Sequence, residues 1–558
     1  MQSAGTLAAV TNAGEAYRWA GVAGLQRRAT GALVGTLIGS TVGWNVPGTA
    51  PPDGAYALAR WDDEAVELLS DACASRTLWY VQDEQVFLAG TSQRAVVALL
   101  GDFQPDPSAT AWLLTSGTLG AEASWDKRIR RLPPDSRLVL DRAAWRCTVH
   151  TTPLTFEDRE GDRATHIARL RDAMEGTVAA LAGDPDFGRW VLPLSGGRDS
   201  RTLLALFAKI GAPPRCLTWT TRSSVRNPLS DASIAQRLAR HFGAEHELYL
   251  LDAKPLDART TLDRFVAANE GRNDEIAGYV DGFGLWAHLL ERDAPAVIRG
   301  DEPFGMRARP ATPDNARQQA GGQMASDFTE GHLVRGLGLT PQSLPERMLR
   351  RDEEDTQAYR SRLSQEGYIA ITAAGLSGAK ARYVEIVTPL LSRGVVTAVR
   401  SLPPALRQYA RAFSAIVHEN ATGIPYARSS STPGMSQLLA SPGLVEELVR
   451  ELTSQDVERV LPGDGARRTL VAMVQEGARH PTITARARGL MKEAVSALPV
   501  EVYYRVKPRW TGPSSVPAAL LALRAALALK TLRLLDGDAG VLAAKAKRAG
   551  SLRRESRA

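Results

Sequence analysis

The sequence predicts an α/β protein with a β-rich N-terminal part, a parallel sheet in the middle and a helical C-terminal extension. Three observations support this fold class. Short apolar runs recur about every ten residues up to residue 150, which is typical of stacked sheets. Strand and helix patterns then alternate over residues 190–251, which is typical of a parallel sheet. From about residue 260 onward, helical periodicity dominates.

The N-terminal part contains four apolar runs that predict strands. They are separated by Asp and Gly and cover residues 54–61, 65–70, 77–81 and 85–89. A further strand at 137–140 is expected to end this part, and the polar stretch 151–162 is expected to be a linker.

The middle part predicts a helix at 166–181, followed by alternating strands and helices. These are expected at 190–194, 201–210, 215–219, 232–242 and 246–251. In such sheets, ligands bind at the carboxyl ends of the strands. Residues 308–325 are polar and predict a surface loop.

The C-terminal part includes an expected amphipathic helix at 516–535, interrupted by Arg524, Lys530 and Arg533. We expect it to pack on the body of the protein rather than on a membrane. No apolar run is long enough to span a bilayer, and no signal peptide is evident. The three scattered cysteines exclude a disulfide framework or a CxxC metal site and favour a cytoplasmic location.

One segment carries the chemistry: residues 194–200, Leu-Ser-Gly-Gly-Arg-Asp-Ser, between a predicted strand and a predicted helix. Gly196 and Gly197 let the backbone approach a ligand closely, and the N–H groups of a helix N-terminus attract anions. Ser195 and Ser200 add hydroxyl groups. The segment therefore predicts a cradle for phosphate or pyrophosphate rather than a merely flexible turn.

Asp199 would repel a bare phosphate, so its presence predicts a Mg²⁺ ion that bridges carboxylate and phosphate. The chain contains neither GxxxxGK[ST] nor GxGxxG, so a Walker A loop and a dinucleotide cofactor are disfavoured.

The segment resembles the pyrophosphatase loop of the asparagine synthetase superfamily (asparagine synthase-related proteins), which includes β-lactam synthetases and lasso-peptide cyclases. Residues 299–305, Arg-Gly-Asp-Glu-Pro-Phe-Gly, resemble the second signature of that family. Residues 385–391 and 401–403 resemble the stretch after its active site. Asp231, Ala232 and His246 also occur where the second βα unit of the family would place such residues.

The resemblance implies an adenine nucleotide α-hydrolase-like ATP-pyrophosphatase domain that binds ATP and Mg²⁺. It implies that Asp199 and Asp301 hold the metal. It implies catalytic roles for Asp199, Asp301 and Glu302, and Arg428 is a further catalytic candidate that could substitute for the family's cation. The implied ATP-binding residues are Leu194, Ser195, Gly196, Gly197, Asp199, Ser200, Leu217, Thr218, Trp219 and Gly300.

The N-terminal part resembles the glutaminase sandwich of the same family at residues 56–62, Asp71 and 76–80. That domain uses a cysteine at its mature N-terminus, whereas this sequence starts Met-Gln-Ser-Ala and its first cysteine is Cys73. We therefore expect a degenerate, structural glutaminase-like domain at 1–155. The ATP-pyrophosphatase domain is expected at 160–435, and a helical extension with a basic tail at 436–558.

Two departures from the family concern its catalytic groups. The family's Gly-Glu-Gly is replaced by residues 296–299, which carry no carboxylate, and its loop lysine is replaced by residues 424–429, where only Arg428 is basic. Arginine is not equivalent to lysine in shape. Three acidic residues could supply a base or could form a solvated helix face: Glu270, Asp274 and Glu275.

The expected function is that of an AMP-forming carbon–nitrogen ligase in natural-product biosynthesis. A small-molecule or peptide carboxylate would attack the α-phosphate of ATP, pyrophosphate would leave, and an amine from a source other than glutamine would capture the acyl-adenylate. Amidation and macrolactam or β-lactam-type closure both stay open, as does a protein partner in a biosynthetic complex. The alternative is a nucleotide-binding pseudo-enzyme or scaffold.

Nucleic acid is not an expected partner. Of the net charge of +7, residues 541–558 contribute +5 through six basic residues and one acidic residue, so the rest of the chain is nearly neutral. The scattered cysteines also disfavour a thiol-dependent RNA-modifying enzyme.

Overall fold

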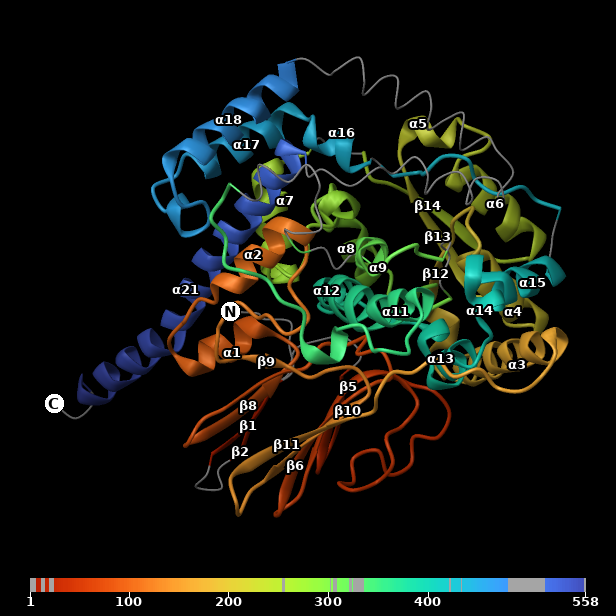
Figure 1. Ribbon diagram of the computed structural model, residues 1–558, viewed down its shortest axis with the longest axis horizontal. Coiled ribbons are helices and arrows are strands. Elements are labelled where there is room, and N and C mark those ends of the chain that lie inside the picture. Colours follow the sequence, from red (N-terminus) through yellow and green to blue (C-terminus); the bar gives the residue numbers. More distant parts are fainter. Residues whose placement is uncertain are drawn as a thin grey trace.

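The computed structural model describes residues 7–11, 16–19, 25–252, 256–301, 303–304, 309–320, 324, 336–420, 423–432, 434–479 and 517–555. It is a mixed α/β structure with antiparallel sheets near the N-terminus, a parallel five-stranded sheet and many helices (Figure 1). The predicted fold class is thus confirmed at this level.

Two antiparallel sheets form the N-terminal part. The first has the order β2-β1-β8-β7-β9, and the second has the order β11-β10-β6-β5-β4-β3. Their strands are β1 (Leu7–Thr11), β2 (Ala16–Trp19), β3 (Leu25–Arg28), β4 (Gly31–Leu37), β5 (Gly54–Trp61), β6 (Ala65–Ser70), β7 (Trp79–Gln82), β8 (Val86–Gly90), β9 (Arg130–Arg131), β10 (Ser136–Asp141) and β11 (Arg146–Thr151).

The two sheets pack face to face because alternate residues of each point into one apolar core. Ala57, Ala59 and Leu68 of the second sheet share this core with Tyr80 and Phe87 of the first. The predicted strands at 54–61 and 65–70 occur at the predicted bounds. The prediction that residue 140 ends this part is wrong, because β11 follows and pairs with β10 along its length.

The parallel sheet has the order β14-β13-β12-β15-β16. Its strands are β12 (Val191–Pro193), β13 (Arg215–Thr220), β14 (His246–Leu250), β15 (Ala296–Ile298) and β16 (Glu385–Val387). The chain runs outward from β12 in one direction through β13 and β14, and in the other through β15 and β16. The carboxyl ends of β12 and β15 therefore form a topological switch point, where ligands bind in open α/β sheets.

Helices cover both faces of this sheet, which explains the continuous apolar runs of its strands. Leu192 and Ile298 face a core with α3 (Arg163–Ala182), α4 (Asp199–Lys209), α6 (Asp231–His241), α13 (Arg393–Arg400) and α15 (Arg411–Glu419). Val191 and Val297 face the opposite core. That core includes α7 (Ala258–Asn269), α8 (Gly284–Glu291) and α12 (Ala374–Lys380).

The prediction of a surface loop at 308–325 is wrong for most of the residues that the structure describes in this range. Residues Pro313–Ala320 form the helix α9, whose Ala316 and Ala320 are buried. The helix packs against α11 (Thr356–Leu363), which continues through a π-helical stretch, η5 (Ser364–Ala373), into α12.

The prediction of an amphipathic C-terminal helix is wrong. In the helix α21 (Ala518–Glu555), residues 521–532 are buried on all sides. It packs against α1 (Gln93–Leu100), α2 (Pro107–Ser116), α7, α17 (Pro442–Leu452) and α18 (Asp464–Arg479). The prediction that it packs on the body is confirmed. None of the helices in the described part of the chain has the length and apolar character needed to span a bilayer.

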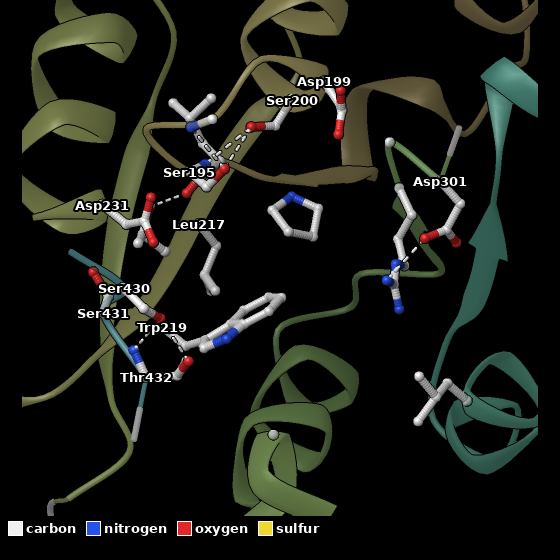
Figure 2. Close-up of a pocket in the computed structure, with 18 of the residues that line it drawn as sticks. Ser195, Asp199, Ser200, Leu217, Trp219, Asp231, Asp301, Ser430, Ser431 and Thr432 are labelled. Atoms are coloured by element: carbon white, nitrogen blue, oxygen red, sulfur yellow. Dashed lines mark hydrogen bonds and ion pairs between the residues drawn. The ribbon is translucent and has the colours of Figure 1, made fainter. Parts of the chain in front are cut away.

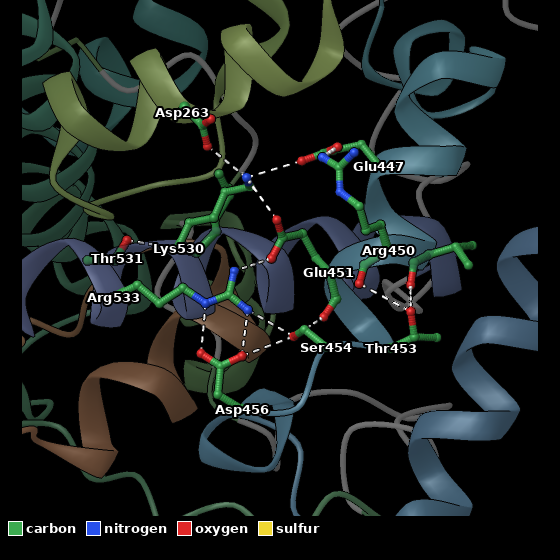
Figure 3. A network of polar contacts seen from close by, with 12 residues as sticks. Asp263, Glu447, Arg450, Glu451, Thr453, Ser454, Asp456, Lys530, Thr531 and Arg533 are labelled. Carbon is green, nitrogen blue, oxygen red and sulfur yellow. Dashed lines mark hydrogen bonds and ion pairs between the residues drawn. The ribbon is translucent and has the colours of Figure 1, made fainter.

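Three basic residues of α21, Arg524, Lys530 and Arg533, are buried or half-buried and ion-paired, as charges inside a helical core must be. Arg524 contacts Asp274 at 2.6 Å. Figure 3 shows the neighbouring network, in which Lys530 Nζ lies 2.9 Å from Glu451 and 2.7 Å from Asp263. Arg533 bridges this network to Asp456, 2.7 Å from its Nε. These pairs join α21 to α7 and α17.

Candidate functional site

A pocket of about 470 Å³ lies at the switch point of the parallel sheet. Its walls come from β13, from the segments after β12 and β15, from residues 275–279 and 430–432, and from α6, α8 and α12. The predicted residues that line it are Leu194, Ser195, Gly197, Asp199, Ser200, Leu217, Thr218, Trp219, Gly300 and Asp301. The topology therefore brings most of the predicted site together.

Two predicted site residues are placed outside the pocket lining, and a third is not described. Gly196 lies directly behind the lining, in contact with the segment around Ala427. Arg428 is exposed and is not part of the pocket wall. Glu302 lies outside the described residues.

The predicted phosphate loop is held by its own hydroxyl groups. Ser200 Oγ accepts a hydrogen bond from the Ser195 backbone N–H at 3.1 Å, and Ser195 Oγ accepts one from Gly197 at 3.2 Å. The two hydroxyl oxygens are 3.1 Å apart, and Figure 2 shows them side by side. A bound phosphate group would have to replace these hydrogen bonds within the loop. The sequence did not predict these bonds.

Asp231 fixes the loop from the other side. Its carboxylate, in the first turn of α6, accepts the Gly196 N–H at 3.0 Å. Burial raises the pKa of Asp231, and the Gly196 bond opposes that change. A Cβ on Gly196 would lie 2.4 Å from the Cβ of Ala427, so a glycine is needed for this close packing.

The segment around residues 424–432 forms a wall of the site. The Ala427 N–H donates to the Gly196 carbonyl at 3.2 Å, and the Ser431 hydroxyl accepts from Ala232 at 2.8 Å. Ser430 and Thr432 are hydrogen-bonded to each other at the rim. This segment therefore brings three hydroxyl groups to the pocket that the sequence did not single out.

Asp199 and Asp301 lie on the side of the pocket away from Asp231 (Figure 2). Burial, opposed by Arg198 but reinforced by Asp301, raises the pKa of Asp199 to about 6. Its Oδ1 atom is buried without a hydrogen-bond partner among the described residues. Asp301 accepts a hydrogen bond from Arg299 at 2.9 Å. A Cβ on Gly300 would lie 2.8 Å from the Asp199 Cβ, so Gly300 permits this approach.

These two carboxylates fit a Mg²⁺ ion that is shared with a phosphate. An orphaned buried carboxylate oxygen lacks a cation or donor, and Mg²⁺ commonly binds one or two carboxylates together with phosphate oxygens and water. The described residues contain no cluster of three or more His, Cys, Asp or Glu side chains that could hold a metal ion.

The opposite part of the pocket is aromatic. Trp219, at the end of β13, and Trp286, on α8, pack with their ring centroids 6.0 Å apart. Thr218 hydrogen-bonds to His246 Nε2 at 2.9 Å. Burial lowers the pKa of His246 to about 4, so this histidine is neutral at pH 7. It positions the end of β13 and does not line the pocket.

The three acidic residues left open by the sequence have different surroundings. Glu270 is buried and accepts a hydrogen bond from Gln93 at 2.9 Å, and Asp274 is paired with Arg524. Both are structural, and the solvated-face alternative is wrong for them. Glu275 is exposed where it lines the pocket. Partial enclosure of its carboxyl group, and then the nearby Asp274, raise the pKa of Glu275.

Sequence reasoning missed Lys380 and Tyr279, which also line the pocket. Lys380 ends α12 and is 3% exposed. Its only sequence signal is a lysine within an apolar helical stretch, and nothing in the sequence connects it to a loop about 180 residues earlier.

The three cysteines are all outside this pocket. Cys73 is fully buried, and burial raises the pKa of its thiol to about 12. Burial likewise raises the pKa of Cys216 to about 12. Neither thiol is poised as a nucleophile, because the thiolate is the reactive form.

No protein-family model matches this chain, and no curated protein matches it. Among solved structures, the glutamine phosphoribosylpyrophosphate (PRPP) amidotransferase from B. subtilis, complexed with ADP and GMP, is similar at 10% sequence identity. The match covers 46% of this chain and 76% of that chain, with a TM-score of 0.16.

Proposed function

We propose that this chain is an AMP-forming ligase, which uses ATP to activate a substrate carboxylate and transfers the acyl group to an amine. The observation that carries the proposal is the joint placement of the Ser-Gly-Gly-Arg-Asp-Ser loop and the pair Asp199 and Asp301 at the switch point of a parallel sheet. The sequence resemblance to the asparagine synthetase superfamily supports it. In this proposal the parallel sheet is the ATP-pyrophosphatase domain, and the N-terminal sheets are the glutaminase-like sandwich.

The loop would bind the pyrophosphate portion of ATP. The Ser195 and Ser200 hydroxyl groups, now bonded within the loop, would turn to donate to phosphate oxygens. The N-terminus of α4, which begins at Asp199, adds a favourable partial charge. Asp231 keeps the Gly196 peptide in place while these bonds exchange.

Asp199 and Asp301 would hold Mg²⁺, which supplies charge neutralisation for the leaving pyrophosphate when bound. Arg299 orients Asp301, because its Nη2 donates to Oδ1 at 2.9 Å. The nearby Asp199 must lose a proton, held with a pKa of about 6, before it can act as a ligand.

The aromatic wall would exclude water from the activated acid, which would otherwise hydrolyse. Trp219, one of the expected ATP-binding residues, would lie against the adenine. Glu275 is the carboxylate best placed to accept the proton of the attacking amine, since it lines the pocket and its pKa is raised. The buried Cys73 supports a source of amine other than glutamine.

The test is product analysis with a trapping amine. The protein is incubated with ATP, MgCl₂, a pool of small carboxylic acids and hydroxylamine, and the nucleotides and hydroxamates are separated by chromatography. The proposal predicts AMP, pyrophosphate and a hydroxamate in equal amounts. Formation of ADP and phosphate would contradict it, and nucleotide binding without any AMP would favour the scaffold alternative.

A matched pair of variants makes this test specific. Asp199→Asn is expected to abolish AMP formation. Asp172→Asn, which changes an exposed carboxylate on α3, is expected to leave it unchanged.

A further inference from the structure

Lys380 is a buried lysine that no described residue neutralises. Its side chain lines the pocket, although the residue is only 3% exposed, whereas lysine is almost never fully buried unless paired. Its Nζ lies 5.1 Å from the centroid of the Trp286 ring and 5.9 Å from that of Tyr279. Within the described residues the amine of Lys380 contacts these two rings and forms no ion pair or hydrogen bond.

The carboxylates near Lys380 already have partners. Asp301 forms an ion pair with Arg299, and Glu385 forms one with Arg76. Arg299, Asp301, Arg76 and Tyr279 are the charged and titratable groups that influence Lys380 from the elements around it, and Glu275 lines the same pocket. The amine is therefore a donor without an acceptor, directed into a cavity.

An anion of single charge would complete this arrangement. One ammonium group in a low-dielectric site balances one negative charge, whereas a phosphate with two charges would be left with an excess. The surrounding wall is apolar, with Tyr279, Trp286 and Leu376. These rings and the leucine match a hydrocarbon or aromatic body rather than a second charged group.

We propose that Lys380 anchors the acid substrate: its ammonium group binds the carboxylate that is activated, and Tyr279, Trp286 and Leu376 contact an apolar or aromatic body. The substrate class is thus a monocarboxylic acid with an apolar body. This inference rests on the proposed function for its chemistry, because the bound carboxylate is the nucleophile toward ATP. A lysine acts as a point charge, so one carboxylate oxygen stays available to attack the α-phosphate.

Binding of the acid should be linked to proton uptake. Burial, and then Arg299, hold the pKa of Lys380 well below its usual value, which favours the neutral amine in the free protein. A bound carboxylate favours the ammonium form, so the site takes up a proton as the acid binds. The affinity for carboxylates should therefore fall as the pH rises.

The test is isothermal titration calorimetry with phenylacetate and its neutral analogue phenylacetamide. Both are titrated into the full-length protein, with and without a Mg²⁺-saturated ATP analogue, in two buffers of different ionisation enthalpy. The wild type should bind phenylacetate in preference to phenylacetamide, with proton uptake. Lys380→Met should weaken phenylacetate binding about 10- to 100-fold and abolish the proton uptake.

Two controls separate anchoring from folding. Lys209→Met changes an exposed lysine on α4 that is paired with Glu175, and it should bind phenylacetate like the wild type. Lys380→Met should melt no lower than the wild type, because methionine replaces an unpaired buried amine with an apolar side chain of similar length.

The outcomes distinguish this inference from the proposed function. Equal phenylacetate binding by the wild type and Lys380→Met, or no preference of the wild type for the carboxylate, would overturn the role of Lys380. Failure of the wild type to bind the ATP analogue, with lysine-dependent carboxylate binding intact, would instead overturn the ligase and retain the anchor.

Discussion

Replacing Asp199 with asparagine should stabilise the protein while removing its nucleotide chemistry. Asp199 is half-buried, its Oδ1 is buried and has no hydrogen-bond partner in the described part of the chain, and burial raises its pKa from 3.8 to about 6. The folded protein therefore binds the proton more tightly than the unfolded chain does. Asparagine is a neutral substitute of nearly the same shape.

The size of the effect follows from linkage. At about 1.4 kcal/mol for each pH unit, the difference between 3.8 and about 6 corresponds to roughly 3 kcal/mol as an upper value. A raised pKa means that the wild-type carboxyl group favours folding below pH 3.8, and that this contribution is lost as the pH rises through about 6. About half of the loss has occurred by pH 5.

The assay is thermal unfolding of the wild type and of Asp199→Asn at pH 5 and pH 8. The variant should melt several degrees higher at pH 8, and its advantage should be clearly smaller at pH 5. Asp172→Asn, at an exposed site, should melt like the wild type at both values. A variant that melts lower than the wild type at pH 8 would show that Asp199 is well compensated in the folded protein, and the reasoning would be refuted.

Three further predictions concern packing and reactivity. Gly300→Ala should destabilise the protein by about 1–3 kcal/mol and weaken nucleotide binding, because the added Cβ would lie 2.8 Å from the Cβ of Asp199. Gly176→Ala, where nothing surrounds the added Cβ on α3, should instead stabilise the protein slightly. Equal melting temperatures of the two variants would disprove the clash. Arg524→Ala should lower the free energy of unfolding by about 3–5 kcal/mol, because it leaves Asp274 buried without its partner. The added change Asp274→Asn should recover part of this stability. No recovery would show that the packing of Arg524 matters instead. Cys73 should react with a thiol reagent only after denaturation, since burial raises its pKa to about 12, and rapid labelling of the native protein at this residue would contradict its placement.

Local patterns predicted the features that depend on local sequence. The strands at 54–61 and 65–70 are short apolar runs bounded by Asp and Gly, and the loop at 194–200 follows an apolar strand, so both were visible without any long-range information. By contrast, β15 and β16 are three residues each, too short to show a period, although they complete the sheet and create the switch point.

Long-range packing decided the rest. The buried state of α21 depends on α1, α2 and α17, and the buried charges looked like a polar helix face because their partners Asp274 and Glu451 are distant in sequence. Lys380 likewise reaches the site only through the fold. Arg428, which could have replaced the family's lysine, is exposed outside the pocket lining, and its segment contributes Ser430, Ser431 and Thr432 to the pocket.

The central claim is that the loop and the two aspartates bind ATP with Mg²⁺, and calorimetry tests it most directly. An ATP analogue with a methylene bridge between the α- and β-phosphates is titrated into the wild type, Asp199→Asn and Asp172→Asn, with MgCl₂ present throughout. The account predicts binding to the wild type and to Asp172→Asn, and loss of binding to Asp199→Asn. No binding to the wild type, or equal binding to all three proteins, would contradict it.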